Sequence, residues 1–204
     1  MASRASEPAF EEACSRFDAA NSEDPNQEIE GGRAVARELL YGQRMTSWLG
    51  RLYPEAGEAL RLAARAQHLC RWRLPRQRFG EGRQGYLEWR TSCAKMHAEL
   101  AGEILRQVGY DETFIARVAS LQRKEGLAED EEVQALEDTA CLVFLENHFA
   151  DLSKSQEDAR MLRILKRTWK KMSLRAQGAA RELELPDDLS SLLRQAVGGG
   201  VGQC

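Results

Sequence analysis

Three side chains combine residue types that could do chemistry with spacings that place them on the apolar faces of expected helices. His68 and His97 are two of only three histidines among 204 residues, and Asp138 shares a helical face with Cys141 and Leu142. Histidine titrates near neutral pH and binds metals as a neutral ligand. If the three helices converge, they form a polar centre with His68, His97 and Asp138 as candidate catalytic residues or as ligands of a divalent metal ion.

A simpler interpretation stays open for each of these residues. An inward histidine is often a hydrogen-bonded structural residue, and an inward aspartate often pairs with an arginine or caps a neighbouring helix. Convergence of all three side chains in one hollow is the feature that would favour chemistry over structure.

A run of basic residues is the second functional feature. The segment from Arg61 to Arg90 holds eight arginines, and a guanidinium presents a planar fork of donors that matches phosphate oxygens. The sequence therefore predicts a phosphate-bearing small molecule or nucleotide as ligand, with four candidate binding residues: Arg71, Arg76, Arg90 and Lys124. The alternative is a solvated loop, or one that forms salt bridges with the acidic residues 129–132.

Helical periodicity runs through almost every segment, and no convincing alternation of β-branched residues occurs, which predicts an all-α, single-domain helical bundle. The helices are expected near the following residues: 8–19, 33–52, 54–72, 86–108, 112–124, 130–151 and 155–172, with further helical pieces around Pro186. Loops are expected at 21–32 and 73–85. We expect an N-terminal helix and polar loop at 1–30, the main helical domain at 31–185, and a C-terminal helix with a flexible glycine-rich tail at 186–204.

Composition excludes several classes of protein. The five cysteines are scattered without a C-x-x-C pair, which indicates a reducing compartment. The longest apolar run, Ala140 to Leu145, is too short to cross a bilayer, and the first residues lack a signal peptide, so a cytoplasmic protein without membrane contact is expected. The sequence has no P-loop, no G-x-G-x-x-G after a strand and no zinc-finger spacing.

Several longer strings resemble a known family. The strings AARAQHLCRWRLPR, GYLEWR, QALEDTACLVFLE and RTWKKMS are similar to those of the domain-of-unknown-function family numbered 4202, over roughly residues 28–180. This family is itself similar to a divergent form of the HD domain, whose typical members hydrolyse phosphoesters with metal ions held by histidines and aspartates. The resemblance implies that His68 stands at the His-Asp pair, His97 in the later histidine helix, and Asp138 at the last metal-binding aspartate.

The sequence departs from that pattern in two places. Leu69 follows His68 where the HD pattern has aspartate, and the helix that should bring the first histidine has Gln43, Arg44 and Ser47 instead. If a metal binds, it would polarise a phosphoryl oxygen while the arginines neutralise the phosphate. If none binds, His68 and His97 could act as acid and base, or hold a ligand.

Three hypotheses about function remain. The first is an HD-like protein that handles a phosphorylated small molecule or nucleotide, as a metal-dependent phosphohydrolase. The second is a metal-free binding module with a structural polar network, whose basic surface meets RNA or a protein. The third is a purely structural helical bundle in which Trp48, Trp72 and Trp89 fill the core.

Overall fold

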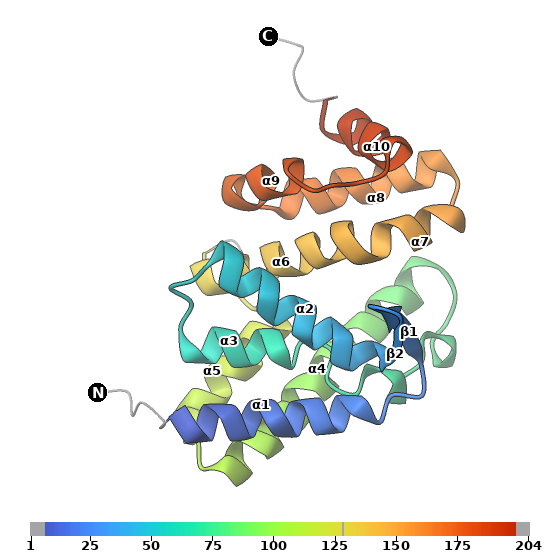
Figure 1. The fold of residues 1–204 in the computed structure, drawn as a ribbon. Coiled ribbons are helices and arrows are strands. Elements are labelled where there is room, and N and C mark those ends of the chain that lie inside the picture. Colours follow the sequence, from blue (N-terminus) through green and yellow to red (C-terminus); the bar gives the residue numbers. More distant parts are fainter. Residues whose placement is uncertain (1–6, 128, 199–204) are drawn as a thin grey trace. The chain divides into compact units, whose positions relative to one another are not determined.

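The computed structural model describes residues 7–127 and 129–198 and confirms the all-α class (Figure 1). Within these residues the chain forms ten α-helices: α1 (Glu7–Ser22), α2 (Arg37–Leu52), α3 (Glu58–Arg65), α4 (Gly82–Val108), α5 (Glu112–Arg123), α6 (Glu131–Val143), α7 (Phe149–Lys154), α8 (Asp158–Lys171), α9 (Leu174–Arg181) and α10 (Asp187–Gly198). Two 3₁₀ turns, η1 (Arg71–Arg73) and η2 (Arg76–Arg78), lie between α3 and α4, and a π-helix, η3 (Phe144–His148), joins α6 to α7.

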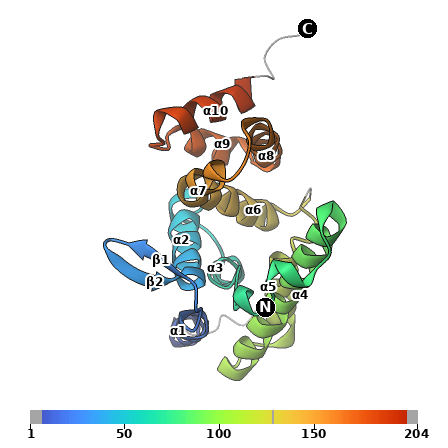
Figure 2. The ribbon, with the colours of Figure 1, turned by 90° about the vertical axis from the view of Figure 1, so that its right-hand side faces the viewer.

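The chain divides into two compact units, Met1–Leu136 and Glu137–Cys204. In the first unit, α5 packs against α3 and α4, α2 packs against α3, and α1 contacts α2, α3 and α4 (Figures 1 and 2). Fully buried side chains fill this core: Phe17, Met45, Leu49, Leu62, Leu69, Leu105 and Leu121. In the second unit, α8 packs against α10. The domain limits expected at residues 30 and 185 stay a prediction.

A β-hairpin stands where a loop and the start of a helix were expected. β1 (Gln27–Glu30) pairs antiparallel with β2 (Arg33–Ala36), and the helix begins at Arg37 rather than at residue 33. Gly31 and Gly32 form the two-residue turn, with φ angles of 55° and 78°. Two successive positive φ angles suit glycine and match the twist of a tight hairpin.

The hairpin is held by charge rather than by an apolar face. Arg44 of α2 forms ion pairs with Glu28 at 2.8 Å and with Glu30 at 3.0 Å, while Ile29 between them is 72% exposed. The expectation of a loop was wrong here because the strands carry no buried apolar alternation, which is the sequence signal for a sheet.

Helix ends near the middle of the chain follow local rules. α4 ends at Val108, and the next residue, Gly109, adopts a left-handed conformation with φ of 101°. The Asp111 side chain caps α5 by accepting from the Phe114 N–H at 2.8 Å. Two other expected limits were wrong. α4 begins at Gly82 rather than near Tyr86, and the helix expected over 130–151 is interrupted by the π-helix η3.

The helix in the C-terminal segment is α10. The expected flexible tail at residues 199–204 lies outside the described residues. Among the helices that the structure describes, none combines the length and the apolar character that crossing a bilayer requires.

Candidate functional site

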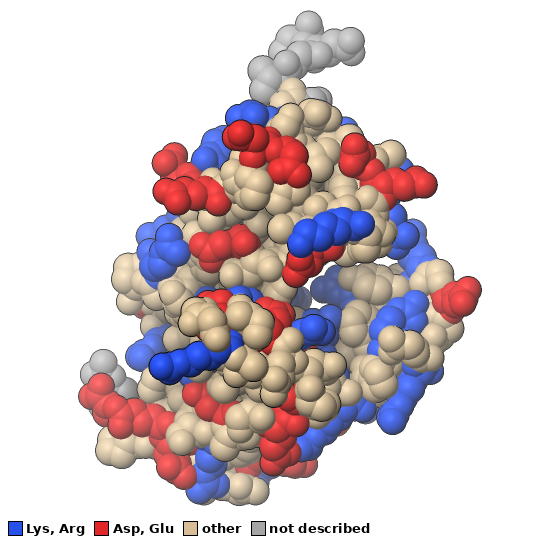
Figure 3. Space-filling model, turned by 45° about the vertical axis from the view of Figure 1, so that its right-hand side comes forward, with Lys and Arg blue, Asp and Glu red and all other residues tan. Residues whose placement is uncertain are grey.

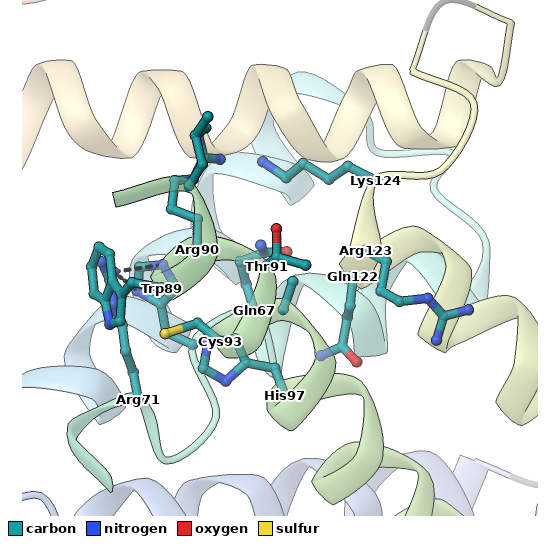
Figure 4. A pocket seen from close by; sticks show the side chains of 13 residues that line it. Gln67, Arg71, Trp89, Arg90, Thr91, Cys93, His97, Gln122, Arg123 and Lys124 are labelled. Atoms are coloured by element: carbon teal, nitrogen blue, oxygen red, sulfur yellow. Dashed lines mark hydrogen bonds between the residues drawn. The ribbon is translucent and has the colours of Figure 1, made fainter. Parts of the chain in front are cut away.

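A pocket of about 250 Å³ opens in the first unit (Figure 4). The turn that follows α3, the first half of α4 and the end of α5 supply its walls. The lining residues are Gln67, His68, Arg71, Leu87, Trp89, Arg90, Thr91, Cys93, Ala94, His97, Gln122, Arg123 and Lys124.

The pocket depends on an early end to α3. The apolar spacing predicts a helix as far as Trp72, but α3 ends at Arg65, and the chain turns before Cys70, whose φ is 55°. Gly42 of α2 permits this arrangement, because a Cβ at that position would lie 2.7 Å from the carbonyl oxygen of Arg65. Gln67 and His68 are therefore presented by a turn and not by a helix face.

Three hydrogen bonds from distant elements hold this turn. The Gln122 side chain in α5 donates from Nε2 to the carbonyl of Ala66 at 2.8 Å, and the His97 ring in α4 donates from Nδ1 to the carbonyl of Leu69 at 2.7 Å. The third bond runs from the Cys70 N–H to the side-chain oxygen of Asn21 at 2.9 Å. Buried backbone groups that would be paired within a helix are satisfied here by side chains.

His68 is held between two other side chains. The Tyr41 ring stacks on it with centroids 3.7 Å apart and an interplanar angle of 10°. Nη1 of Arg71 lies 3.0 Å from Nδ1 and 2.8 Å from Nε2 of His68. One atom this close to both ring nitrogens lies over the ring face, because the Cε1–H group occupies the ring plane between them. The contact is thus a cation on an aromatic face rather than a pair of in-plane hydrogen bonds.

Glu38 is the partner of His68 in the ring plane. Its Oε2 lies 3.1 Å from Nδ1 of His68, and its side chain is 10% exposed. Burial raises the pKa of Glu38 to about 7, against the opposing effect of Arg71. A buried carboxyl whose pKa lies near neutrality, in contact with an imidazole, is an arrangement that general acid–base catalysis can use.

Glu38 was not among the residues predicted from the sequence. Its signal was present, because Glu38 shares the buried face of α2 with Tyr41, Met45 and Leu49, and a buried acid on such a face requires a partner.

His97 is 3% exposed, and its ring centroid lies 5.9 Å from that of His68. The structure therefore brings together the two histidines that were predicted to converge. Because a carbonyl only accepts, the bond to Leu69 fixes the proton on Nδ1 and leaves Nε2 as the acceptor. Burial lowers the pKa of His97 to about 4, so the ring is neutral near pH 7.

Asp138 belongs to the second unit and is completely buried. Its Oδ1 accepts from the Ser173 N–H at 2.8 Å, and its Oδ2 accepts from the Ser173 hydroxyl. Ser173 in turn caps α9 by accepting from the Ala176 N–H at 3.2 Å. Asp138 is not one of the residues that line the pocket, and the contacts described fit the structural interpretation of an aspartate that anchors a neighbouring helix.

Three of the four predicted phosphate-binding residues line the pocket: Arg71, Arg90 and Lys124. Lys124 and Arg90 extend toward one another in Figure 4, whereas Arg123 turns away and pairs with Glu125 at 2.6 Å. No carboxylate is present among the described residues that line the pocket. The lining is therefore cationic and suits an anion.

The fourth predicted residue, Arg76, does not line the pocket. Its guanidinium donates to the carbonyl oxygens of Phe79 at 3.1 Å and of Gly82 at 3.4 Å, and so shapes the basic segment itself. The same segment places Arg73, Arg78 and Arg83 on the surface, and Figure 3 shows basic side chains gathered on the right of the face that it draws.

Trp89 supports the cationic wall. Its indole Nε1 donates to the carbonyl of Leu74 at 2.8 Å, and the Arg71 guanidinium lies 4.8 Å from its ring centroid. Trp89 thus orients Arg71 over His68 instead of only filling core.

Within residues 7–127 and 129–198, no group of three or more His, Cys, Asp or Glu side chains is arranged to hold a metal ion. The expected divalent metal stays a prediction, and no chemical step below is assigned to it.

The fold and the site define an all-α protein with a cationic pocket beside a buried glutamate that contacts a half-buried histidine. The chain belongs to the family described as domain of unknown function (DUF4202), whose model matches residues 11–193. Comparison with curated proteins and with solved structures gave no match.

Proposed function

We propose that the pocket binds a phosphate-bearing small molecule, with Arg71, Arg90 and Lys124 neutralising the phosphate. The observation that carries the proposal is the gathering of these cations in one concave site whose described lining residues include no Asp or Glu. Guanidinium groups bind phosphate oxygens through charge-assisted hydrogen bonds, which are stronger than hydrogen bonds between neutral groups.

The size of the pocket limits the ligand. A volume of about 250 Å³ is just below the range of roughly 300–1,000 Å³ that is typical of small-molecule sites. This size favours a sugar phosphate or a mononucleotide over a larger ligand.

We also propose the cytoplasmic location that the sequence predicts, and the free thiols of Cys14, Cys70 and Cys93 support it.

Binding is tested by titrating the protein with methyl phosphate, ribose 5-phosphate and adenosine 5′-monophosphate. Calorimetry and NMR measure the binding of each compound. Arg90→Gln should weaken binding of the phosphate by about tenfold or more, because a charge-assisted hydrogen bond is lost. Arg83→Gln is the matched control, since Arg83 is an exposed arginine of the same helix outside the pocket. Absence of binding at about 10 mM for all three compounds, or equal weakening by the two variants, contradicts the proposal.

A second candidate function, phosphoester hydrolysis at the same pocket, is favoured by the His68–Glu38 pair at its wall. In this version His68 takes a proton from the water that attacks phosphorus, and Glu38 stabilises the resulting imidazolium. The ester P–O bond breaks, and the leaving oxygen receives that proton from His68. Measuring turnover with and without added Mn²⁺ distinguishes the HD-like, metal-assisted form of this hypothesis from the metal-free form.

Hydrolysis is tested with p-nitrophenyl phosphate and bis-p-nitrophenyl phosphate. Turnover that is lost in both His68→Gln and Glu38→Gln supports the enzyme. Phosphate binding without any His68-dependent turnover identifies the protein as a binding module instead. If RNA or a protein binds and the small phosphate compounds do not compete with it, the alternative partner classes are favoured.

A further inference from the structure

Two buried amide oxygens in the pocket lack hydrogen-bond partners. Oε1 of Gln67 and Oε1 of Gln122 are buried, and no donor among the described residues pairs with either of them. Gln67 is 9% exposed and Gln122 is 2% exposed, and both residues line the pocket. Buried polar atoms are almost always paired, so two unpaired acceptors at one cavity require an explanation.

The orientation of the Gln122 amide is fixed by its other atom. Nε2 of Gln122 donates to the carbonyl of Ala66 at 2.8 Å, and that carbonyl only accepts. Reversing the amide would place two acceptors against each other and is therefore unfavourable. The oxygen is consequently the atom of Gln122 that is left for another partner.

The two glutamines come from different elements, which the hydrogen bond between Gln122 and Ala66 joins. Gln67 lies in the turn after α3, directly after Ala66, and Gln122 lies at the end of α5. The hydrogen bond between Gln122 and Ala66 thus holds both amides at the pocket (Figure 4). Neither oxygen attracts an anion, because an amide oxygen carries partial negative charge.

We infer that the ligand has two chemically different ends: a phosphate for the cationic side chains, and hydroxyl or amino groups that donate to Gln67 and Gln122. This inference rests on the proposed binding of a phosphate-bearing molecule and specifies its class. A phosphorylated compound with donor groups, such as a sugar phosphate or a nucleotide whose base carries an amino group, satisfies both sets of lining residues. A simple phosphate monoester without donors satisfies only one.

The physical reason for selectivity is the cost of an unsatisfied buried group. A site built to accept hydrogen bonds rejects an analogue that lacks the donor, because the ligand displaces water from the acceptor without replacing its bond. Discrimination between the ligand classes should therefore depend on the glutamines, whereas the affinity for phosphate should depend on the arginines.

The experiment compares methyl phosphate with ribose 5-phosphate and adenosine 5′-monophosphate in the full-length protein. Wild-type protein should bind at least one of the donor-bearing compounds about tenfold more tightly than methyl phosphate. Gln67→Met, which keeps the length of the side chain and removes the acceptor, should abolish that preference and leave binding of methyl phosphate within about twofold. Gln43→Met, at an exposed position of α2 outside the pocket, is the matched control.

The outcomes separate this inference from the proposed function. If methyl phosphate binds as tightly as both other compounds, or if Gln67→Met weakens all three equally, the inference is wrong while phosphate binding stands. If no compound binds, the proposed function fails and the inference fails with it. Circular dichroism and thermal unfolding establish that Gln67→Met is folded.

Discussion

Oε2 of Glu38 lies 3.1 Å from Nδ1 of His68, although the two residues are 30 positions apart in the chain. Glu38 enters the site from the first turn of α2, and His68 enters from the turn after α3. Asp24 and Asn21 fix the backbone of Glu38, because Asp24 accepts from its N–H and Asn21 donates to its carbonyl, each at 3.2 Å. The carboxyl group is thereby held against His68, which lines the pocket.

Glu38 gives the first prediction, which concerns the loss of stability as the pH rises from 5 to 8. Its folded-state pKa of about 7 lies above the ordinary glutamate value of 4.5, so the folded state binds the proton more tightly than the unfolded state does. The resulting stabilisation is complete below about pH 4.5 and is lost as the pH rises through 7. Between pH 5 and pH 8, wild type should lose roughly 2 kcal/mol relative to Glu38→Gln.

Urea unfolding of both proteins at the two pH values measures this difference. Glu11→Gln, at an exposed position of α1, should track wild type. Parallel pH profiles for wild type and Glu38→Gln would show that Glu38 is ionised in the folded state.

His97 gives a prediction of opposite sign. Its folded-state pKa of about 4 lies below the ordinary histidine value of 6.5, so the unfolded state binds the proton more tightly. Stability is therefore lost as the pH falls from about 6.5 toward 4. His97→Gln retains a donor for the carbonyl of Leu69 and should reduce the loss between pH 7 and pH 4.5 by roughly 2 kcal/mol.

The same unfolding experiment at these two pH values tests His97, with His148→Gln as the comparison because His148 lies in the second unit. An identical acid profile for wild type and His97→Gln would contradict a buried neutral ring.

Salt dependence is a separate prediction for the pocket. If Arg71, Arg90 and Lys124 bind a phosphate, raising ionic strength from 0.05 M to 0.5 M should weaken binding several-fold, because screening acts on the exposed part of the site. In Arg90→Gln the dependence should be smaller, since one of the cations is absent. Calorimetry with ribose 5-phosphate at the two salt concentrations measures both slopes. Salt-independent affinity would mean that the ligand is held by uncharged contacts.

Asp138 and Ser173 yield a prediction for the second unit. Ser173→Ala removes the hydroxyl that donates to Asp138 and the oxygen that caps α9. The free energy of unfolding should fall by about 1–3 kcal/mol, from loss of the cap and from a buried carboxylate left with fewer donors. Phosphate binding in the first unit should be unchanged.

Thermal and chemical unfolding measure the effect of Ser173→Ala, and Ser155→Ala provides an exposed serine as control. Unaltered stability together with lost phosphate binding would instead assign Asp138 to the pocket.

Local rules predicted much of the helical structure. The caps at Gly109 and Asp111 involve only near neighbours in the chain, so the residue types were sufficient to predict where α4 ends and α5 begins. The arginine-rich segment likewise indicated the cationic side of the pocket, because charge composition is visible without a fold.

The sequence by itself determined the all-α class and the candidate histidines, since both follow from periodicity and residue type. Tertiary structure decided that α3 ends at Arg65, because the competing bonds to Ala66 and Leu69 come from residues of α5 and α4. It also decided that Glu38 faces His68 and that Asp138 faces Ser173. Such pairings depend on how helices pack in space, and a helical pattern specifies only which face of each helix is buried.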